Sequence, residues 1–82
     1  MKFLLKFKPK AVKDLKQIPK DQVMKILEKI EKLQFGLQGD IKRLTDFTPE
    51  YRLRVGNYRV LFEIEENKII IYRILHRKDA YK

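Results

Sequence analysis

The sequence predicts an α+β fold of the order β-α-α-β-β-β, with a helical hairpin packed on one face of a small antiparallel sheet. Two observations carry this prediction. Apolar residues recur with a helical period between residues 11 and 33, and with a period of 2 after residue 50. In addition, Gly56-Asn57 separates two alternating runs, which is a strong signal for a β-hairpin. Helices and strands that are segregated along a chain in this way indicate the α+β class.

The first strand and the first helix meet at Pro9. Residues 2–8 place Phe3, Leu5 and Phe7 at alternate positions, which predicts a strand with one buried face. Proline ends that strand and suits the first turn of a helix. We expect the helix to stop at Pro19, and its apolar stripe has the spacing i, i+4, i+7. The members of the stripe are Ala11, Leu15 and Ile18.

The second helix is expected to begin at Asp21, as its N-cap, and to stop at Gly36. Glu28 and Lys32 lie four residues apart and would pair on the solvent side. The other side carries an apolar stripe that we expect to pack on the sheet. This stripe consists of Val23, Ile26, Leu27, Ile30 and Leu33.

Three strands follow a loop of turn-forming residues that ends near Pro49. Each strand is an alternating run, and the runs are separated by Gly56-Asn57 and by Glu65-Glu66-Asn67. The strands are expected at Tyr51–Val55, Tyr58–Ile64 and Lys68–Leu75.

Length and composition indicate a single domain over residues 1–82, because 82 residues usually build one core. The absence of cysteine excludes thiol catalysis and cysteine-based zinc sites, and one histidine cannot form a two-histidine metal site. The longest run without a polar residue, Ile69–Tyr72, is far shorter than the roughly 20 residues of a membrane span. We therefore expect a cytoplasmic protein that uses no metal or cofactor.

The net charge of +9, from 20 basic and 11 acidic residues, points to an anionic partner such as nucleic acid or an acidic protein. Every basic residue up to Lys42 is a lysine, and the lysines of the first 20 residues would attract RNA diffusely or serve solubility alone. Arginine, whose planar fork binds phosphate bidentately, is confined to the second half. The arginines are Arg43, Arg52, Arg54, Arg59, Arg73 and Arg77.

The hairpin at Gly56-Asn57 allows its register to be predicted. A two-residue turn makes Arg54 face Arg59, and alternation then places Arg52 on the same side, opposite to the apolar side chains. Like charges directly opposite in a sheet cost about 0.2–1 kcal/mol, so the pair needs an acid or a bound anion. Glu63 is the acid of this hairpin that shares the face. We interpret the face as a phosphate-binding platform, and the alternative is a solvated surface.

Two motifs of the C-terminal half carry a family resemblance. The hairpin reads R-x-R-x-G-x-Y-R from Arg52 to Arg59, and the chain ends with H-R-K-D-x-Y from His76 to Tyr81. Together with residues 41–44 and the helical hairpin, these motifs resemble the RelE/ParE superfamily of bacterial and archaeal toxins over nearly the whole chain. The resemblance implies the RelE-like β-α-α-β-β-β fold and a hetero-oligomer with a cognate, RelB-like antitoxin. In the RelE branch, which we favour, it also implies cleavage of mRNA in the ribosomal A site.

The reaction that the resemblance implies is attack of a ribose 2′-hydroxyl on the neighbouring phosphodiester, which leaves a 2′,3′-cyclic phosphate and needs no metal. Fixed cations would stabilise the five-coordinate phosphate. By the resemblance, Arg59 and Arg77 would stabilise the transition-state charge. Arg52 and Arg54 would position the phosphate, and Tyr81 would stack on a base or transfer a proton.

The proton acceptor of this reaction stays open. Arginine is a poor base at neutral pH, and this chain has arginines where the best-described branch uses strand lysines. Tyr81 is the first candidate, and His76 as a neutral imidazole is the second. The alternative for His76 is a strand-end histidine bonded to backbone. The carboxylates of Glu50 and Asp79 are further candidates.

Arg43, Arg73 and Lys78 are expected to bind RNA, or to pair with the antitoxin, and not to catalyse. Two other readings stay open: a ParE-like inhibitor of DNA gyrase without RNA chemistry, and an inert relative whose basic face only holds its antitoxin. Fold cannot choose among these readings, because the scaffold is shared. The clustered arginines with a terminal aromatic residue favour the nuclease, since a gyrase inhibitor needs no phosphate cradle.

Overall fold

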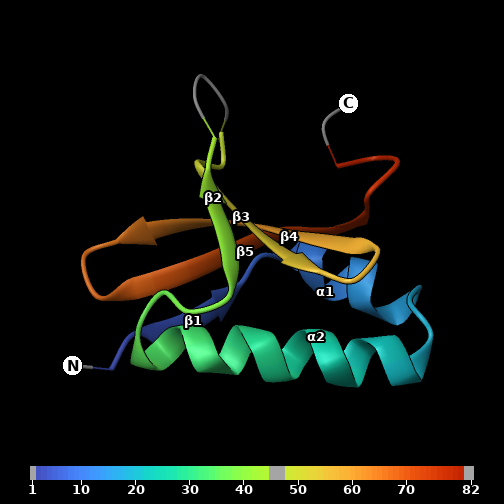
Figure 1. Ribbon diagram of the computed structural model, residues 1–82, viewed down its shortest axis with the longest axis horizontal. Coiled ribbons are helices and arrows are strands. Elements are labelled where there is room, and N and C mark those ends of the chain that lie inside the picture. The colour runs from blue at the N-terminus through green and yellow to red at the C-terminus, as the bar shows by residue number, and fades with distance from the viewer. Residues whose placement is uncertain (1, 45–47, 81–82) are drawn as a thin grey trace.

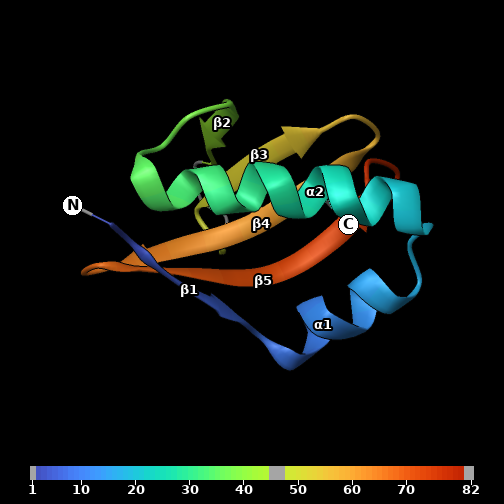
Figure 2. The ribbon, with the colours of Figure 1, turned by 90° about the horizontal axis from the view of Figure 1, so that it is seen from below.

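Two helices lie on one face of a five-stranded sheet in the computed structural model of the protein, which describes residues 2–44 and 48–80 (Figures 1 and 2). In chain order the elements are β1 (Leu4–Phe7), α1 (Pro9–Lys16), α2 (Lys20–Lys32), the short 3-10 helix η1 (Leu33–Phe35), β2 (Asp40–Arg43), β3 (Tyr51–Val55), β4 (Tyr58–Glu65) and β5 (Lys68–His76). The strand order across the sheet is β1-β5-β4-β3-β2. The α+β class and the helical hairpin on one sheet face are confirmed.

The sheet differs from the predicted one in two respects. It is mixed and not antiparallel, because β1 runs parallel to β5, with Leu5 opposite Ile69. Pairing between the two ends of the chain leaves no mark in local periodicity. The second difference is β2, which lies in the predicted loop and pairs with β3, with Ile41 opposite Leu53. With one apolar residue in four, Asp40–Arg43 has too little alternation to be recognised as a strand.

The helices begin and end close to the predicted residues. α1 begins at Pro9. α2 begins at Lys20 with Pro19 at the N-cap position, so Asp21 lies in the first turn and does not cap the helix as predicted. The chain leaves η1 at Gly36, whose φ of 140° favours glycine. Neither helix of the described part of the chain combines the length and the apolar character needed to cross a membrane.

The core fills the space between the helices and the sheet. The predicted stripe of α2 contributes Ile26 and Ile30, both fully buried, and Leu33 of η1 extends it. On the sheet side, Phe62 is fully buried and its ring stacks on that of Tyr51 with 5.5 Å between the centroids. Full burial of one such side chain contributes about 1.5–3 kcal/mol. The buried core comprises Ala11, Ile26, Ile30, Leu33, Leu53, Val60, Phe62, Ile69, Ile71 and Ile74.

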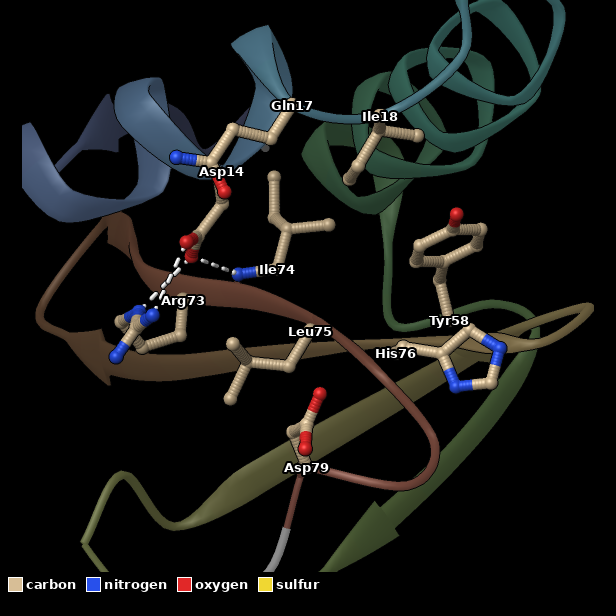
Figure 3. A pocket seen from close by; sticks show the side chains of 9 residues that line it. All are labelled: Asp14, Gln17, Ile18, Tyr58, Arg73, Ile74, Leu75, His76 and Asp79. Carbon is tan, nitrogen blue, oxygen red and sulfur yellow. Dashed lines mark hydrogen bonds and ion pairs between the residues drawn. The ribbon is translucent and has the colours of Figure 1, made fainter.

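Asp14 holds α1 against the free edge of β5. β1 pairs with β5 only as far as Phe7 opposite Ile71, so the amide of Ile74 lies beyond the last strand pair. Asp14 Oδ2 accepts a hydrogen bond from that amide at 2.9 Å. The carboxylate also accepts two hydrogen bonds from the Arg73 guanidinium, at 2.8 and 3.0 Å (Figure 3). These hydrogen bonds raise the pKa of Arg73 and outweigh its partial burial, which lowers it.

We expect Asp14→Ala to lower the free energy of unfolding by about 2 kcal/mol, because a carboxylate that accepts three hydrogen bonds is lost. This loss is smaller than three hydrogen bonds to a charged group would give in a buried site, because the Arg73 side chain is 37% exposed and water screens the pair. Asp14→Asn keeps an oxygen for the Ile74 amide and should lose about half as much. Urea denaturation measures both variants, and equal losses would show that this backbone hydrogen bond adds nothing.

Candidate functional site

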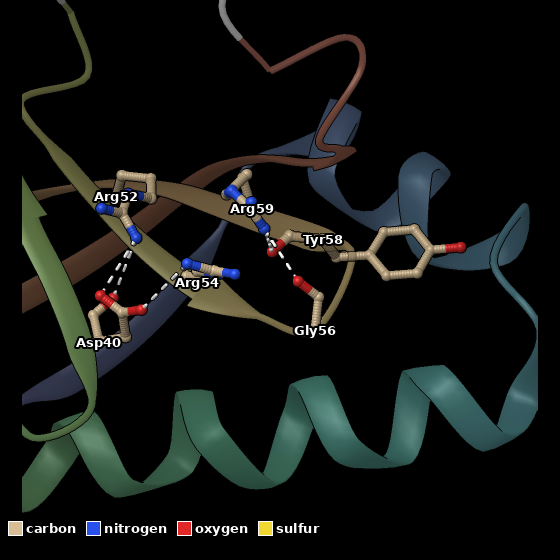
Figure 4. A network of polar contacts seen from close by, with 6 residues as sticks. All are labelled: Asp40, Arg52, Arg54, Gly56, Tyr58 and Arg59. Carbon is tan, nitrogen blue, oxygen red and sulfur yellow. Dashed lines mark hydrogen bonds and ion pairs between the residues drawn. The ribbon is translucent and has the colours of Figure 1, made fainter.

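The β3–β4 hairpin has the predicted register. Arg54 lies opposite Arg59, and Gly56 in the turn has a φ of 58°. Alternation along the strands places Arg52, Arg54 and Arg59 on the side of the sheet away from the helices, whereas Leu53 between them is buried in the core. We call the surface formed by Arg52, Arg54 and Arg59 the arginine face (Figure 4). The predicted convergence of these three residues beside one turn is confirmed.

Strand β2 adds two charged residues to the arginine face. Its register puts Asp40 opposite Arg54, and Lys42 opposite Arg52. One oxygen of Asp40 lies 3.4 Å from Nη1 of Arg52, and the other lies 3.9 Å from Nη1 of Arg54 (Figure 4). The acid that offsets the opposed arginines is therefore Asp40. Glu63, which we had expected in this role, accepts a backbone amide hydrogen bond at 2.7 Å.

The three arginines differ in burial and in partners. The Arg52 side chain is only 12% exposed, and its Nε is buried without a hydrogen-bond partner in the described structure. A buried N–H left unpaired costs about 1–3 kcal/mol. Arg54 is mostly exposed. Arg59 Nη1 donates to the carbonyls of Gly56 and Tyr58, each at 3.0 Å. Among residues 2–44 and 48–80, no carboxylate forms an ion pair with Arg59.

We expect Asp40→Asn to raise the affinity for oligouridylate about fivefold at low salt. Asp40 competes with an anionic ligand for two guanidinium groups, and an exposed ion pair is worth up to about 1 kcal/mol. The gain should vanish near 1 M salt, because the Debye length there is only about 3 Å and exposed charges are almost fully screened. Asp21→Asn on α2 is the matched control, because it changes the net charge equally. An equal gain in the control would show that net charge alone acts.

Arg77 and Tyr81 belong to the C-terminal motif. The amide of Arg77 donates to the carbonyl of Asn57 at 2.8 Å, so its backbone is held beside the β3–β4 turn. The Arg77 side chain is exposed. In Figure 1 the segment after β5 leaves the sheet on the side away from α2. The backbone of Arg77 therefore lies at the same end of the sheet as Arg59. Tyr81 lies outside the described residues.

His76 is separated from the arginine face. It lies opposite Tyr58, and the two rings meet edge to face with 5.5 Å between the centroids. Tyr58 points to the helix side of the sheet, so His76 does as well. Its Nδ1 accepts a hydrogen bond from the amide of Lys78 at 3.3 Å, which is the backbone-bonded alternative stated above. Both rings line a pocket of about 410 Å³ that also includes Asp14 and Asp79 (Figure 3).

The residues expected to bind RNA are spread over different elements. Arg43 lies opposite Tyr51, on the helix side of β2, and its Nη2 is 3.2 Å from a carboxylate oxygen of Glu50. Arg73 is held by Asp14, as described above. Lys78 is exposed in the turn after β5. Among the described residues, no cluster of three or more histidine, aspartate or glutamate side chains could hold a metal ion.

Lys42 and Asp40 are the residues of this site that the sequence analysis missed. The sequence contains only a short indication of this strand: the two charged residues flank Ile41 directly after Gly39. Such a segment becomes a recognisable strand only once its partner β3 is known. With Lys42 included, the face carries four basic side chains and one ion-paired carboxylate, that of Asp40. This excess of positive charge is suited to binding a polyanion.

The sequence matches the family model described as "ParE toxin of type II toxin-antitoxin system, parDE" over residues 5–81. The protein is thus a toxin of a type II toxin-antitoxin system. The match covers nearly the whole chain, and the chain belongs to this family within the RelE/ParE superfamily.

Relatives and solved structures agree with this assignment. Toxin RelE3 of Methanocaldococcus jannaschii is 41% identical over 75 residues, which cover 85% of each chain. The toxin-antitoxin complex RelB-RelE from Methanococcus jannaschii contains a chain with a TM-score of 0.79 and 39% identity, covering 93% of this chain and 94% of that one. The archaeal RelE-RelB complex from Pyrococcus horikoshii OT3 gives a TM-score of 0.79 at 27% identity, covering 98% and 100%.

Proposed function

We propose that this toxin is a ribosome-dependent endoribonuclease that cleaves mRNA in the A site. The 2′-hydroxyl of one ribose attacks the adjacent phosphorus, the bond to the 5′-oxygen of the next nucleotide breaks, and the products carry a 2′,3′-cyclic phosphate and a 5′-hydroxyl. The chain's own side chains supply the charge stabilisation, without a metal. Since mRNA and ribosomes are the substrate and the platform, the proposed place of action is the cytoplasm.

The observation that supports this proposal is the arginine face. Three guanidinium groups project from one hairpin on the helix-free side of the sheet, with Asp40 as their acidic neighbour. Charge that develops on a five-coordinate phosphate is stabilised best by donors fixed in advance. Asp40 holds Arg52, and the carbonyls of the turn hold Arg59. These two cations are thus oriented before any RNA arrives.

The arrangement supports a division of roles among the arginines. Arg52, mostly buried and held by Asp40, is suited to position a phosphate oxygen. Arg54 lies beside it and adds a second positioning fork. Arg59 has no carboxylate partner among the described residues, so its charge is the most available to the transition state. Arg77, whose backbone is held at Asn57, is proposed to add charge from the C-terminal side.

The proton acceptor is proposed to be Tyr81, which follows Arg77 in the C-terminal motif. His76 is the weaker candidate, because its register places it on the helix side of the sheet. The carboxylate of Glu50 is engaged by Arg43. Asp79 lines the same pocket as His76 and not the arginine face.

The proposed partner is a RelB-like antitoxin, forming a hetero-oligomer with this chain. The two solved relatives described above are complexes of a RelE with a RelB. A net charge of +9 favours an acidic antitoxin segment that would neutralise the arginine face while its apolar residues enter a groove. Such a segment would compete directly with RNA.

Inhibition of DNA gyrase is the second candidate function, because the matching family model is that of a ParE toxin. This reading requires no RNA chemistry, and the shared scaffold does not decide between the two. The clustered cations of the arginine face favour the nuclease, since a gyrase inhibitor has no need of a phosphate cradle.

The discriminating experiment maps messenger 5′ ends after brief expression of the toxin and measures gyrase supercoiling with the purified protein. Cuts in phase with codons and full supercoiling are expected. Intact messages with inhibited supercoiling would support gyrase as the target. Intact messages with normal supercoiling would leave an inert relative that only holds its antitoxin.

A further inference from the structure

A basic pocket, separate from the arginine face, lies where β1 passes into α1. Its volume is about 610 Å³, and it is lined by Lys8, Pro9, Lys10, Pro49, Tyr72 and Arg73. The two prolines form apolar walls, and Tyr72 contributes a half-buried aromatic ring. Lys8 and Lys10 are exposed at the rim. None of the residues assigned to catalysis above lines this pocket.

A bulge in β5 brings Tyr72 and Arg73 to this pocket. Phe62 of β4 lies opposite Ile71, but its neighbour Leu61 lies opposite Arg73, so Tyr72 is an extra residue in β5. Under strict alternation Arg73 would share the core side with Ile71. The bulge places it opposite Leu61 instead, beside Tyr72. Bulges of this kind often re-aim side chains next to functional sites.

Part of the pocket is fixed before any ligand binds. Asp14 fixes the Arg73 guanidinium with hydrogen bonds of 2.8 and 3.0 Å, which keeps this wall in place (Figure 3). The ammonium group of Lys8 lies over the Tyr72 ring, 5.3 Å from its centroid. One face of the ring is thus turned toward the exposed Lys8 side chain. A flat base can take that position, because stacking and cation–π attraction use the same face of the ring.

The pocket and the arginine face are linked through the strand register. Lys42, Arg52, Leu61 and Arg73 lie directly opposite one another in a row across β2, β3, β4 and β5. Neighbouring strands are about 4.8 Å apart, so the backbones at Arg52 and Arg73 are separated by about 10 Å. A single-stranded chain with a phosphate at Arg52 can therefore bring a neighbouring nucleotide to the pocket.

We infer that this pocket is a nucleotide subsite for single-stranded RNA, in which one unstacked base lies on Tyr72 and the adjoining phosphates contact Lys8 and Lys10. The inference deepens the proposed function and rests on it for the choice of RNA as the ligand. An acidic protein segment would also satisfy the lysines. The aromatic ring between apolar walls favours RNA, because every base presents a π-face that stacks without regard to sequence.

The test uses a short, fluorescently labelled oligoadenylate and the full chain, with fluorescence anisotropy at low salt. Tyr72→Ala is expected to weaken binding about tenfold, a loss typical of one base–aromatic stack. Tyr72→Phe should stay within about twofold, because the ring is kept. Phe35→Ala is the matched control: Lys2 lies over the Phe35 ring at 5.7 Å, a similar pair remote from the row of strand residues. It should leave the affinity unchanged.

An abasic scan identifies the stacked base. Removing one base at a particular position of the oligonucleotide should weaken binding to the unmodified protein about tenfold. The same removal should have no effect on binding to Tyr72→Ala. Lys8→Ala and Lys10→Ala should each reduce the salt slope of the binding constant by about 0.7, the value for one phosphate contact on a single strand.

Several results would overturn the inference. These are an affinity of Tyr72→Ala equal to that of the unmodified protein, an abasic effect that persists in this variant, or no binding of the oligonucleotide at all. Weaker antitoxin binding with unchanged RNA binding would assign the pocket to the protein partner and overturn it too. The binding assay involves no cleavage, so the two proposals can fail separately. A protein that binds RNA through Tyr72 but cuts no message would refute the proposed nuclease activity and support the nucleotide subsite.

Discussion

Arg59→Ala is expected to slow messenger cleavage about a hundredfold or more while the protein stays folded. Arg59 faces the helix-free side of the hairpin and has no carboxylate partner in the described part of the chain. Loss of one fixed donor at a developing charge typically costs about 10²–10³ in kcat. The free energy of unfolding should change by only about 0.5 kcal/mol, because the side chain contributes nothing to the core.

Single-turnover cleavage by programmed ribosomes measures this effect, and two variants serve as its controls. Arg59→Lys keeps the charge but loses the planar fork, so an intermediate rate is expected. Lys29→Ala removes the same charge from the exposed surface of α2 and should leave the rate unchanged. If Lys29→Ala slowed cleavage as much as Arg59→Ala, only the overall charge would be involved. An unchanged rate for Arg59→Ala would remove this residue from the mechanism.

Phe62→Ala is expected to have the largest effect on stability. The ring is fully buried between the sheet and the helices and stacks on Tyr51. Truncation of such a residue costs about 3–5 kcal/mol through lost burial and the cavity left behind. Small domains have a total stability of about 5–15 kcal/mol, so much of it would be lost. At about 4–8 °C for each kcal/mol, Tm should fall by at least about 12 °C.

Phe35→Ala is the matched control for this prediction, because its ring is 69% exposed. The same chemical change there should alter the free energy of unfolding by about 0.5 kcal/mol or less. Thermal unfolding followed by circular dichroism compares the two variants. Similar shifts in Tm for both would contradict the described core.

The register of the β3–β4 hairpin was predictable because it depends on a local feature. A two-residue turn at Gly56-Asn57 determines every pairing up the two strands, and Gly56 adopts the positive φ that the turn requires. The convergence of Arg52, Arg54 and Arg59 follows from that turn and from alternation alone. The apolar stripe of α2 was predictable for the same reason, since its period is a property of one segment.

The remaining differences come from pairings between distant segments. Asp40 and Lys42 join the arginine face only because β2 pairs with β3, and the parallel pairing of β1 with β5 links the two ends of the chain. Neither pairing can be read from periodicity within one segment. The ion pairs of Asp40 depend on this register, which is why Glu63 was expected in its place.

The position of His76 shows how one extra residue changes a prediction. With unbroken alternation, His76 would share a side with Ile70, away from the helices. The bulge at Tyr72 reverses the sides of all later residues in β5, so His76 faces Tyr58 on the helix side. A one-residue shift moves every side chain to the other face, and no feature of the run Ile69–Leu75 marks the bulge.

The most direct test of the proposed chemistry identifies the ends of the RNA fragments released from programmed ribosomes by the purified toxin. The arginine face, acting on a ribose 2′-hydroxyl, predicts fragments that end in a 2′,3′-cyclic phosphate and begin with a 5′-hydroxyl, and predicts their loss with Arg59→Ala. Fragments with 3′-hydroxyl and 5′-phosphate ends, or uncut RNA with the unmodified protein, would contradict it.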